Sequence, residues 1–173
     1  MQPDRLRIGL IVATGIGSWY GMQLVHEAGH VLHAWISGGA VVKVDLPLIG
    51  FSSTTVQPNP HPHFVTWGGP LWGMTLPVAL MMVATARRWR WTFLNRFFAG
   101  FCLIANGAYL GVGWLADAGD AADLLRYGSP AWLLTLIGVI ALATGLGCWN
   151  NLGPHFGFTR QRTARRAAIS QED

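Results

Sequence analysis

Charged residues are scarce in this sequence. The 173 residues include 12 Lys and Arg and 8 Asp and Glu, so that 12% of the chain is charged and 51% is hydrophobic. Soluble domains carry about 25% charged residues, and this shortage argues against a soluble globular protein. The formal net charge is +4, but the basic residues form no face interleaved with aromatic side chains. We therefore expect no nucleic-acid partner.

Cysteine is nearly absent as well. Cys102 and Cys148 are the only two cysteines, and both lie in apolar segments without the spacing of metal ligands. This pattern excludes a disulfide framework and a cysteine-based zinc site. We interpret both side chains as small buried hydrophobic groups.

The chain is rich instead in long apolar segments. Four of them reach the length of about 20 helical residues that crosses the hydrocarbon core of a bilayer, at about residues 6–37, 64–86, 92–115 and 130–149. Between the first two lies GGAVVKVDLPLIGFSSTTVQPNPHPH, whose β-branched residues and Gly and Pro predict a pair of short strands. We predict an all-α membrane protein with four transmembrane helices and a short strand-like hairpin segment between the first two.

The positions of the basic residues predict the orientation in the membrane. Arginines cluster near both ends of the chain and between the second and third apolar segments, so the positive-inside rule places both termini in the cytoplasm. The first apolar stretch runs on toward His26 without a convincing small-x-small cleavage site, and we expect a retained anchor helix. The prediction is a multi-pass protein of the bacterial inner membrane, with one domain over residues 1–159 and a basic, disordered cytoplasmic tail over residues 160–173.

Polar residues lie inside the first apolar segment, where they are costly. His26, Glu27 and His30 form an H-E-x-x-H sequence, and helical residues four apart share a face with Cβ atoms about 5–6 Å apart. The two imidazoles can therefore bind one zinc ion. Histidines four residues apart on a helix suit one zinc ion better than the alternatives, a haem or a chlorophyll. Glu27 is rotated by about 100° from His26 and can act as general base and acid. An acidic residue near the centre of a span costs about 2.5–3.5 kcal/mol, which disfavours retention without function.

Three further histidines are weaker candidates. His33 lies seven residues from His26, or about 10.5 Å along a helix, too far to share an ion that His30 also binds. We expect it to support the site or to lie at the membrane interface. His61 and His63 form H-x-H in the connecting segment, where solvated loop histidines are the default over a metal or substrate role.

A third zinc ligand is expected from WLADAGDAADLLRYG, residues 114–128. The first and third apolar segments cross the membrane in the same direction, so the end of the third returns to the level of the two histidines. Asp117, Asp120 and Asp123 cluster there. One of these carboxylates would complete a His2Asp set with an open position, as in catalytic zinc sites. The alternative role for an Asp at this place is helix capping.

These features together resemble the site-2-protease family of intramembrane zinc metalloproteases. The resemblance covers about residues 10–125. It depends on HEAGH (26–30) inside a span, on the strand-like segment that follows, and on GGPLWG (68–73), which is similar to the family's Gly-Pro signature. The family's third element departs from the pattern: no proline follows Asn106, and Asp-Gly is replaced by Asp120-Ala121.

The resemblance implies an enzyme, a zinc-dependent intramembrane metallopeptidase that hydrolyses a peptide bond in or near a membrane-spanning segment. It implies zinc ligands at His26, His30 and Asp120, with Asp117 as the reserve choice. Glu27 would be catalytic, Asn106 substrate-binding, and the strand segment would pair with an extended substrate. The partners would be a membrane protein substrate and the lipid bilayer.

A second hypothesis remains open on the same residues. A chain with four spans and no soluble domain for substrate selection also suits a non-catalytic structural or assembly subunit of a larger membrane complex. Gly107 and Gly111 have the G-x-x-x-G spacing that allows close helix packing, either within the fold or against partner subunits.

Overall fold

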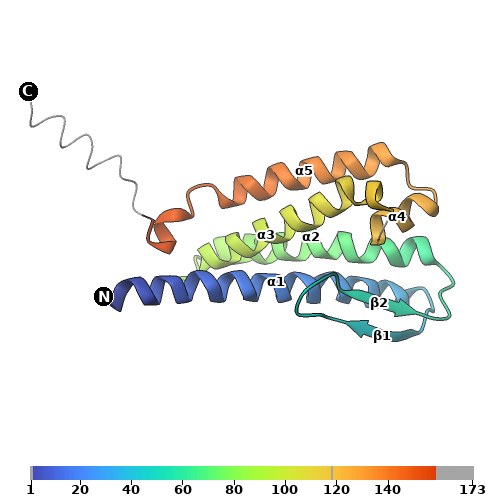
Figure 1. Ribbon diagram of the computed structural model, residues 1–173, viewed down its shortest axis with the longest axis horizontal. Helices are drawn as coiled ribbons and strands as arrows, with labels where there is room; N and C mark the ends of the chain where they lie inside the picture. Colours follow the sequence, from blue (N-terminus) through green and yellow to red (C-terminus); the bar gives the residue numbers. More distant parts are fainter. Residues whose placement is uncertain (1, 118, 159–173) are drawn as a thin grey trace, which may run out of the picture.

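The computed structural model describes residues 2–117 and 119–158, and four long helices dominate it. The helices are α1 (Gln2–Ile36), α2 (Pro62–Ala86), α3 (Thr92–Val112), α4 (Gly119–Arg126) and α5 (Ala131–Trp149), with short 3-10 turns at η1 (Gly113–Ala116) and η2 (Gly153–Phe156). The long helices run side by side as a bundle (Figure 1). Four of them are long and apolar enough to cross a membrane. This confirms the predicted fold class.

The start and end of each long helix follow from local sequence. Pro62 occupies the first turn of α2, where its missing N–H is not needed. Pro130 precedes α5, which ends at Trp149 before Asn151 adopts a positive φ of 61°. The sequence did not predict the short helix α4, and the predicted tail over residues 160–173 lies outside the described residues.

The predicted strand pair is present between α1 and α2. Strands β1 (Val41–Asp45) and β2 (Ser53–Val56) are antiparallel and pair Val41 with Val56 and Asp45 with Ser53. The hairpin lies along the second half of α1 (Figure 1). Along β2, exposed and partly buried residues alternate, as expected for a strand with one face against protein. Thr54 is on the partly buried face.

Close packing through glycine joins the helices. A Cβ at Gly138 of α5 would come within 2.5 Å of the Gly111 Cα of α3, and a Cβ at Gly107 would come within 2.8 Å of the Ala141 Cβ. The G-x-x-x-G pair therefore packs inside the fold, which removes one reason to expect a partner subunit at this face. Gly29 of α1 and Gly68 of α2 are in similar contact, backbone against backbone, which brings the GGP sequence beside HEAGH.

The two ends of the described chain lie at the same end of the bundle (Figure 1). The Arg7 guanidinium, near the start of α1, donates a hydrogen bond to the Gly157 carbonyl after η2. An even number of long helices places both ends on one side, as the predicted topology requires. The face of the membrane to which they belong stays a prediction.

Candidate metal centre

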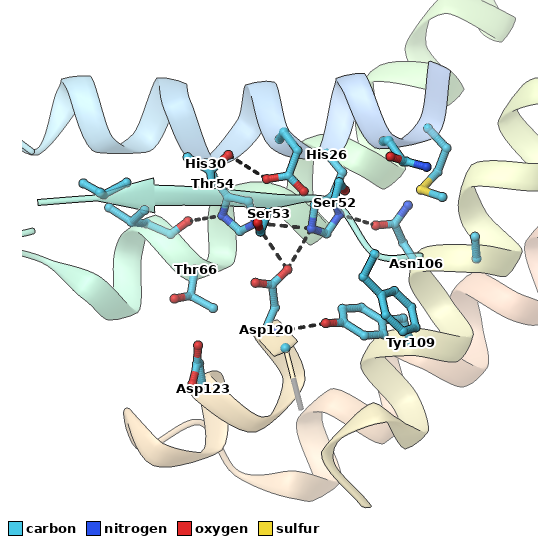
Figure 2. A pocket seen from close by; sticks show the side chains of 18 of the residues that line it. His26, His30, Ser52, Ser53, Thr54, Thr66, Asn106, Tyr109, Asp120 and Asp123 are labelled. Carbon is cyan, nitrogen blue, oxygen red and sulfur yellow. Dashed lines mark hydrogen bonds and ion pairs between the residues drawn. The ribbon is translucent and has the colours of Figure 1, made fainter. Parts of the chain in front are cut away.

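Four elements converge on the H-E-x-x-H residues. His26, Glu27 and His30 of α1 are buried, with exposed fractions of 8%, 2% and 6%. Helix α2 contributes the Val65 carbonyl and β2 contributes Thr54, whereas α3 supplies Asn106 and α4 supplies Asp120. Figure 2 shows the two histidine side chains and Asp120 pointing toward one another from α1 and α4.

Three ligand atoms meet at one point. The Nε2 atom of His26 lies 2.7 Å from Asp120 Oδ2, the Nε2 atom of His30 lies 3.2 Å from the same oxygen, and the two nitrogens are 3.2 Å apart. Tetrahedral zinc with bonds of about 2.0–2.1 Å separates its ligand atoms by about 3.3 Å. The three atoms are therefore spaced close to the edges of such a tetrahedron, with one corner left over.

The other nitrogen of each imidazole has its own partner. His26 Nδ1 donates to Asn106 Oδ1 over 2.7 Å, and His30 Nδ1 donates to the Val65 carbonyl over 2.8 Å. The Asn106 amide is oriented by its own donation from Nδ2 to the Cys102 carbonyl at 2.9 Å, so its oxygen faces the histidine. Hydrogen bonds of this kind fix the tautomer that leaves Nε2 free to bind a metal.

This arrangement crowds three acceptors together. With both Nδ1 hydrogens engaged, neutral imidazoles present lone pairs at Nε2, and the carboxylate oxygen adds a negative charge. A shared proton can satisfy one pair of these atoms, whereas one divalent cation satisfies all three.

Helix α2 leaves open the space beside both nitrogens. A Cβ at Gly69 would overlap the Nε2 atoms of His26 and His30. The space is open only because residue 69 has no side chain. This gives the GGP sequence a physical role, because the backbone of α2 lies directly against the point where the ligand atoms converge.

Glu27 lies beside the three atoms and is held by the hairpin. Its Oε2 accepts a hydrogen bond of 2.6 Å from Thr54 Oγ1 of β2. Ligand atoms of His26, Glu27 and His30 also lie within 4.8 Å of one another, but Asp120 Oδ2 is closer to both nitrogens. Asp120 is therefore the carboxylate placed best to join the two histidines around a metal ion, and Glu27 lies beside them.

A cavity of about 410 Å³ opens onto this cluster. Besides the cluster it is bordered by α1 residues one and two turns earlier, by the end of the hairpin loop and the start of β2, and by side chains of α3 and α4. Asn106, Tyr109 and Asp123 are among these side chains (Figure 2). A molecule bound in the cavity would contact His26, His30 and Asp120, as well as Glu27 and the hairpin, at once.

The structure separates the remaining predicted residues from the cluster. His33 donates from Nδ1 to the Phe64 carbonyl at 2.7 Å and accepts from Trp72 Nε1 at 3.3 Å. It therefore joins α1 to α2. His63 Nε2 is 2.8 Å from Ser129 Oγ, a link between α2 and the segment before α5.

Neither of the other aspartates reaches the histidines. Asp117 is exposed and pairs with Arg126 at 2.8 Å, and Asp123 pairs with the same guanidinium at 2.9 Å. Their attraction raises the pKa of Arg126. These contacts stabilise the surface of α4, and the reserve choice of Asp117 as a ligand finds no support in the geometry.

Asn106 is predicted to bind substrate, and it borders the cavity. Its amide oxygen is already engaged by His26, so in the structure it orients the His26 imidazole. The substrate role stays a prediction.

Sequence reasoning missed two residues of the site. Thr54 could have been identified by its inward position in the alternating strand. Tyr109 accepts a hydrogen bond from the backbone N–H of Asp120 at 3.1 Å and so connects α3 to the start of α4. The only feature of the sequence that could have identified Tyr109 is its position one turn after Asn106 on the same helix face.

Comparisons of the chain with protein-family models, with curated proteins and with solved structures find no match. The functional interpretation therefore depends on the geometry of the site.

Proposed function

We propose that this protein is a zinc-dependent intramembrane metallopeptidase, related in its chemistry to the site-2 proteases that the sequence resembles. One observation carries the proposal: His26 Nε2, His30 Nε2 and Asp120 Oδ2 lie within 3.2 Å of one another, beside a buried glutamate and an open cavity.

The donor set fits zinc. Two imidazole nitrogens and one carboxylate are typical ligands of a catalytic zinc site, in which three protein ligands leave one position open. The hydrogen bonds behind both imidazoles add the support that such ligands usually have. Zinc bound here would supply Lewis acidity, which makes water a nucleophile near neutral pH and polarises a substrate carbonyl.

The protein's own residues would carry the proton transfers. Glu27 takes a proton from the attacking water and passes it to the leaving amine of the cleaved bond, first as general base and then as general acid. Thr54 holds one oxygen of this carboxylate through its 2.6 Å hydrogen bond, which leaves the other oxygen for the proton. Asn106 and the Val65 carbonyl keep the imidazoles aligned.

The substrate is proposed to be a peptide bond in or near a membrane-spanning segment. The cluster lies on α1, within one of the four apolar helices, so a substrate must reach it from the bilayer or its interface. A helical segment would have to unwind first, because a helix encloses its peptide bonds in its own hydrogen bonds. We propose a bacterial inner membrane location with both termini in the cytoplasm.

A test compares wild type with Glu27→Gln. Both proteins, purified in detergent, should hold about one zinc per chain, whereas only wild type should cleave reconstituted single-span peptides. The loss in rate should be about 100-fold or more, the usual contribution of a general base. Asp117→Asn, which changes an exposed carboxylate that pairs with Arg126 outside the cavity, is the matched control and should cleave normally.

Equal cleavage by wild type and Glu27→Gln would contradict the proposal. Purification in a stoichiometric complex with no bound zinc would favour the alternative, a non-catalytic subunit.

A further inference from the structure

Three buried polar atoms in the described part of the chain have no hydrogen-bond partner. They are the indole nitrogen of Trp19, the side-chain oxygen of Gln23 and the side-chain oxygen of Asn59. Leaving such an atom unpaired costs about 1–3 kcal/mol, and native proteins contain few of them. Each one therefore requires an explanation.

All three residues border the cavity of the metal cluster. Their coincidence in one cavity is hard to attribute to imperfect packing, which would scatter unpaired atoms over the bundle. Gln23 is the strongest case, because its side chain is 1% exposed and its amide nitrogen makes only a long contact of 3.4 Å with the Pro47 carbonyl.

The three atoms lie on both sides of the cluster. Gln23 and Trp19 precede His26 on α1 by about one and two helical turns, toward the N-terminus of the helix. Asn59 lies toward the other end of α1, because the adjacent Pro58 carbonyl accepts from Ala40 N at 3.1 Å, just after that helix. A ligand that satisfied all three would therefore pass across the metal ligands.

We propose that Trp19, Gln23 and Asn59 bind the main chain of an extended peptide on the two sides of the metal cluster. The inference rests on the proposed peptidase function and specifies how its substrate is held. An extended chain presents N–H and C=O groups in alternation, which matches one N–H donor and two carbonyl acceptors in the protein. Main-chain recognition would tolerate many side chains.

The spacing fits such a peptide. Gln23 lies four residues before Glu27, or about 6 Å along the helix, and Trp19 lies about 12 Å away. An extended chain advances about 3.3 Å per residue. These two side chains would then contact the peptide at about two and four residues from the reacting bond.

Hydroxamates of increasing length test the proposal by binding alone. Acetohydroxamic acid binds zinc and has no peptide chain. Two series extend it with alanine and leucine, one with the peptide on the amino side of the hydroxamate and one with the peptide on the carboxyl side through a succinyl group. Calorimetry of the zinc-loaded full chain in detergent measures the gain in affinity from acetohydroxamic acid to four residues.

In wild type both series should gain affinity with length. Trp19→Phe and Gln23→Met should each reduce this gain in affinity about three- to tenfold, both in the same series, because each variant removes one hydrogen bond. Asn59→Leu should lose a similar factor in the other series. Acetohydroxamic acid should bind all variants like wild type.

Matched controls are available in the chain. Trp35 is an exposed tryptophan on α1, and Gln57 is an exposed glutamine next to Pro58, so Trp35→Phe and Gln57→Met should keep the full gain. The melting temperature of Gln23→Met should equal or exceed that of wild type, because an unpaired buried acceptor has been removed. If Gln23→Met fails to fold, Trp19→Phe still tests whether these side chains bind the peptide main chain, because it removes only the indole N–H.

Two results would overturn the inference, and they are distinguishable. If acetohydroxamic acid does not bind the zinc-loaded wild type, the proposed function fails and this inference fails with it. If it binds, but the three variants keep the full gain from peptide length, only the main-chain clamp is wrong and ordered water satisfies the three atoms.

Discussion

At the residue scale, the site depends on which nitrogen of each imidazole faces the cavity. His26 and His30 both direct Nε2 toward Asp120, because Asn106 and the Val65 carbonyl occupy their Nδ1 hydrogens. One of these acceptors is a side chain and can be changed by mutation. The other is a backbone group protected from substitution.

Asn106→Leu should weaken zinc binding about 10- to 100-fold, the usual effect of removing the group behind a ligating histidine. A competition titration with a coloured zinc chelator measures the affinity. Asn95→Leu changes an asparagine earlier on α3, which contacts the Trp91 carbonyl, and should leave zinc affinity unchanged. Equal affinity in Asn106→Leu and wild type would show that His26 is oriented by other contacts.

Thr54 is the second informative residue. Thr54→Val keeps the shape and removes the hydroxyl that holds Glu27, so kcat should fall about tenfold or more, as for loss of a hydrogen bond to a charged group. KM and zinc content should stay at wild-type values, and Thr54→Ser should restore most of the rate. Thr55→Val, on the exposed face of the same strand, is the control. A fall in zinc content instead of kcat would assign Thr54 to metal binding.

At the element scale, a short helix decides which aspartate reaches the two histidines. After α3, η1 and Asp117, whose φ is 50°, turn the chain back, and Gly119 with a φ of 64° begins α4. The Tyr109 hydroxyl occupies the position that a Cβ at Gly119 would take and binds the N–H of Asp120. Asp120, the residue that follows Gly119, therefore enters the cavity.

Helix α2 provides the prediction at this scale. Gly69→Ala would place a methyl group against both Nε2 atoms, so we expect zinc binding to be lost even though alanine favours helix over glycine by about 1 kcal/mol. Gly17→Ala on α1, where no atom lies within 4 Å, should be neutral or slightly stabilising. Zinc analysis and melting temperature measure both effects. Normal zinc content in Gly69→Ala would mean that the ligands lie elsewhere.

At the scale of the whole molecule, the candidate metal centre joins elements that are far apart in the chain. His26 and Asp120 are 94 residues apart in sequence and 2.7 Å apart in space. A cation that binds only the folded arrangement stabilises it, by about 2.7 kcal/mol at a concentration 100 times its dissociation constant.

Zinc should therefore raise the melting temperature of wild type and have little effect on Asp120→Ala. Asp117→Ala, which removes a carboxylate bound only by Arg126 among the contacts of the described chain, should respond to zinc like wild type. Thermal unfolding in detergent with a chelator and with added zinc measures the shift. An equal shift in Asp120→Ala would assign the third ligand to another carboxylate, with Glu27 the nearest candidate.

The local sequence by itself determined the four apolar helices, the strand pair and the histidine pair. Each of these follows from the order of neighbouring residues: about 20 apolar residues make a span, and residues four apart share a helix face. For this reason His26 and His30 could be paired from the sequence, and His33 could be separated from them.

Only the tertiary structure showed which aspartate contacts the histidines and which other side chains hold the site. Asp117 and Asp120 are three residues apart in equally polar sequence, and the turn after α3 leaves the first exposed and the second partly buried against the histidines. Thr54 meets Glu27, and Asn106 meets His26, because separate elements pack together. Contacts between distant segments depend on helix packing and on the exact turn geometry, which local residue patterns do not encode.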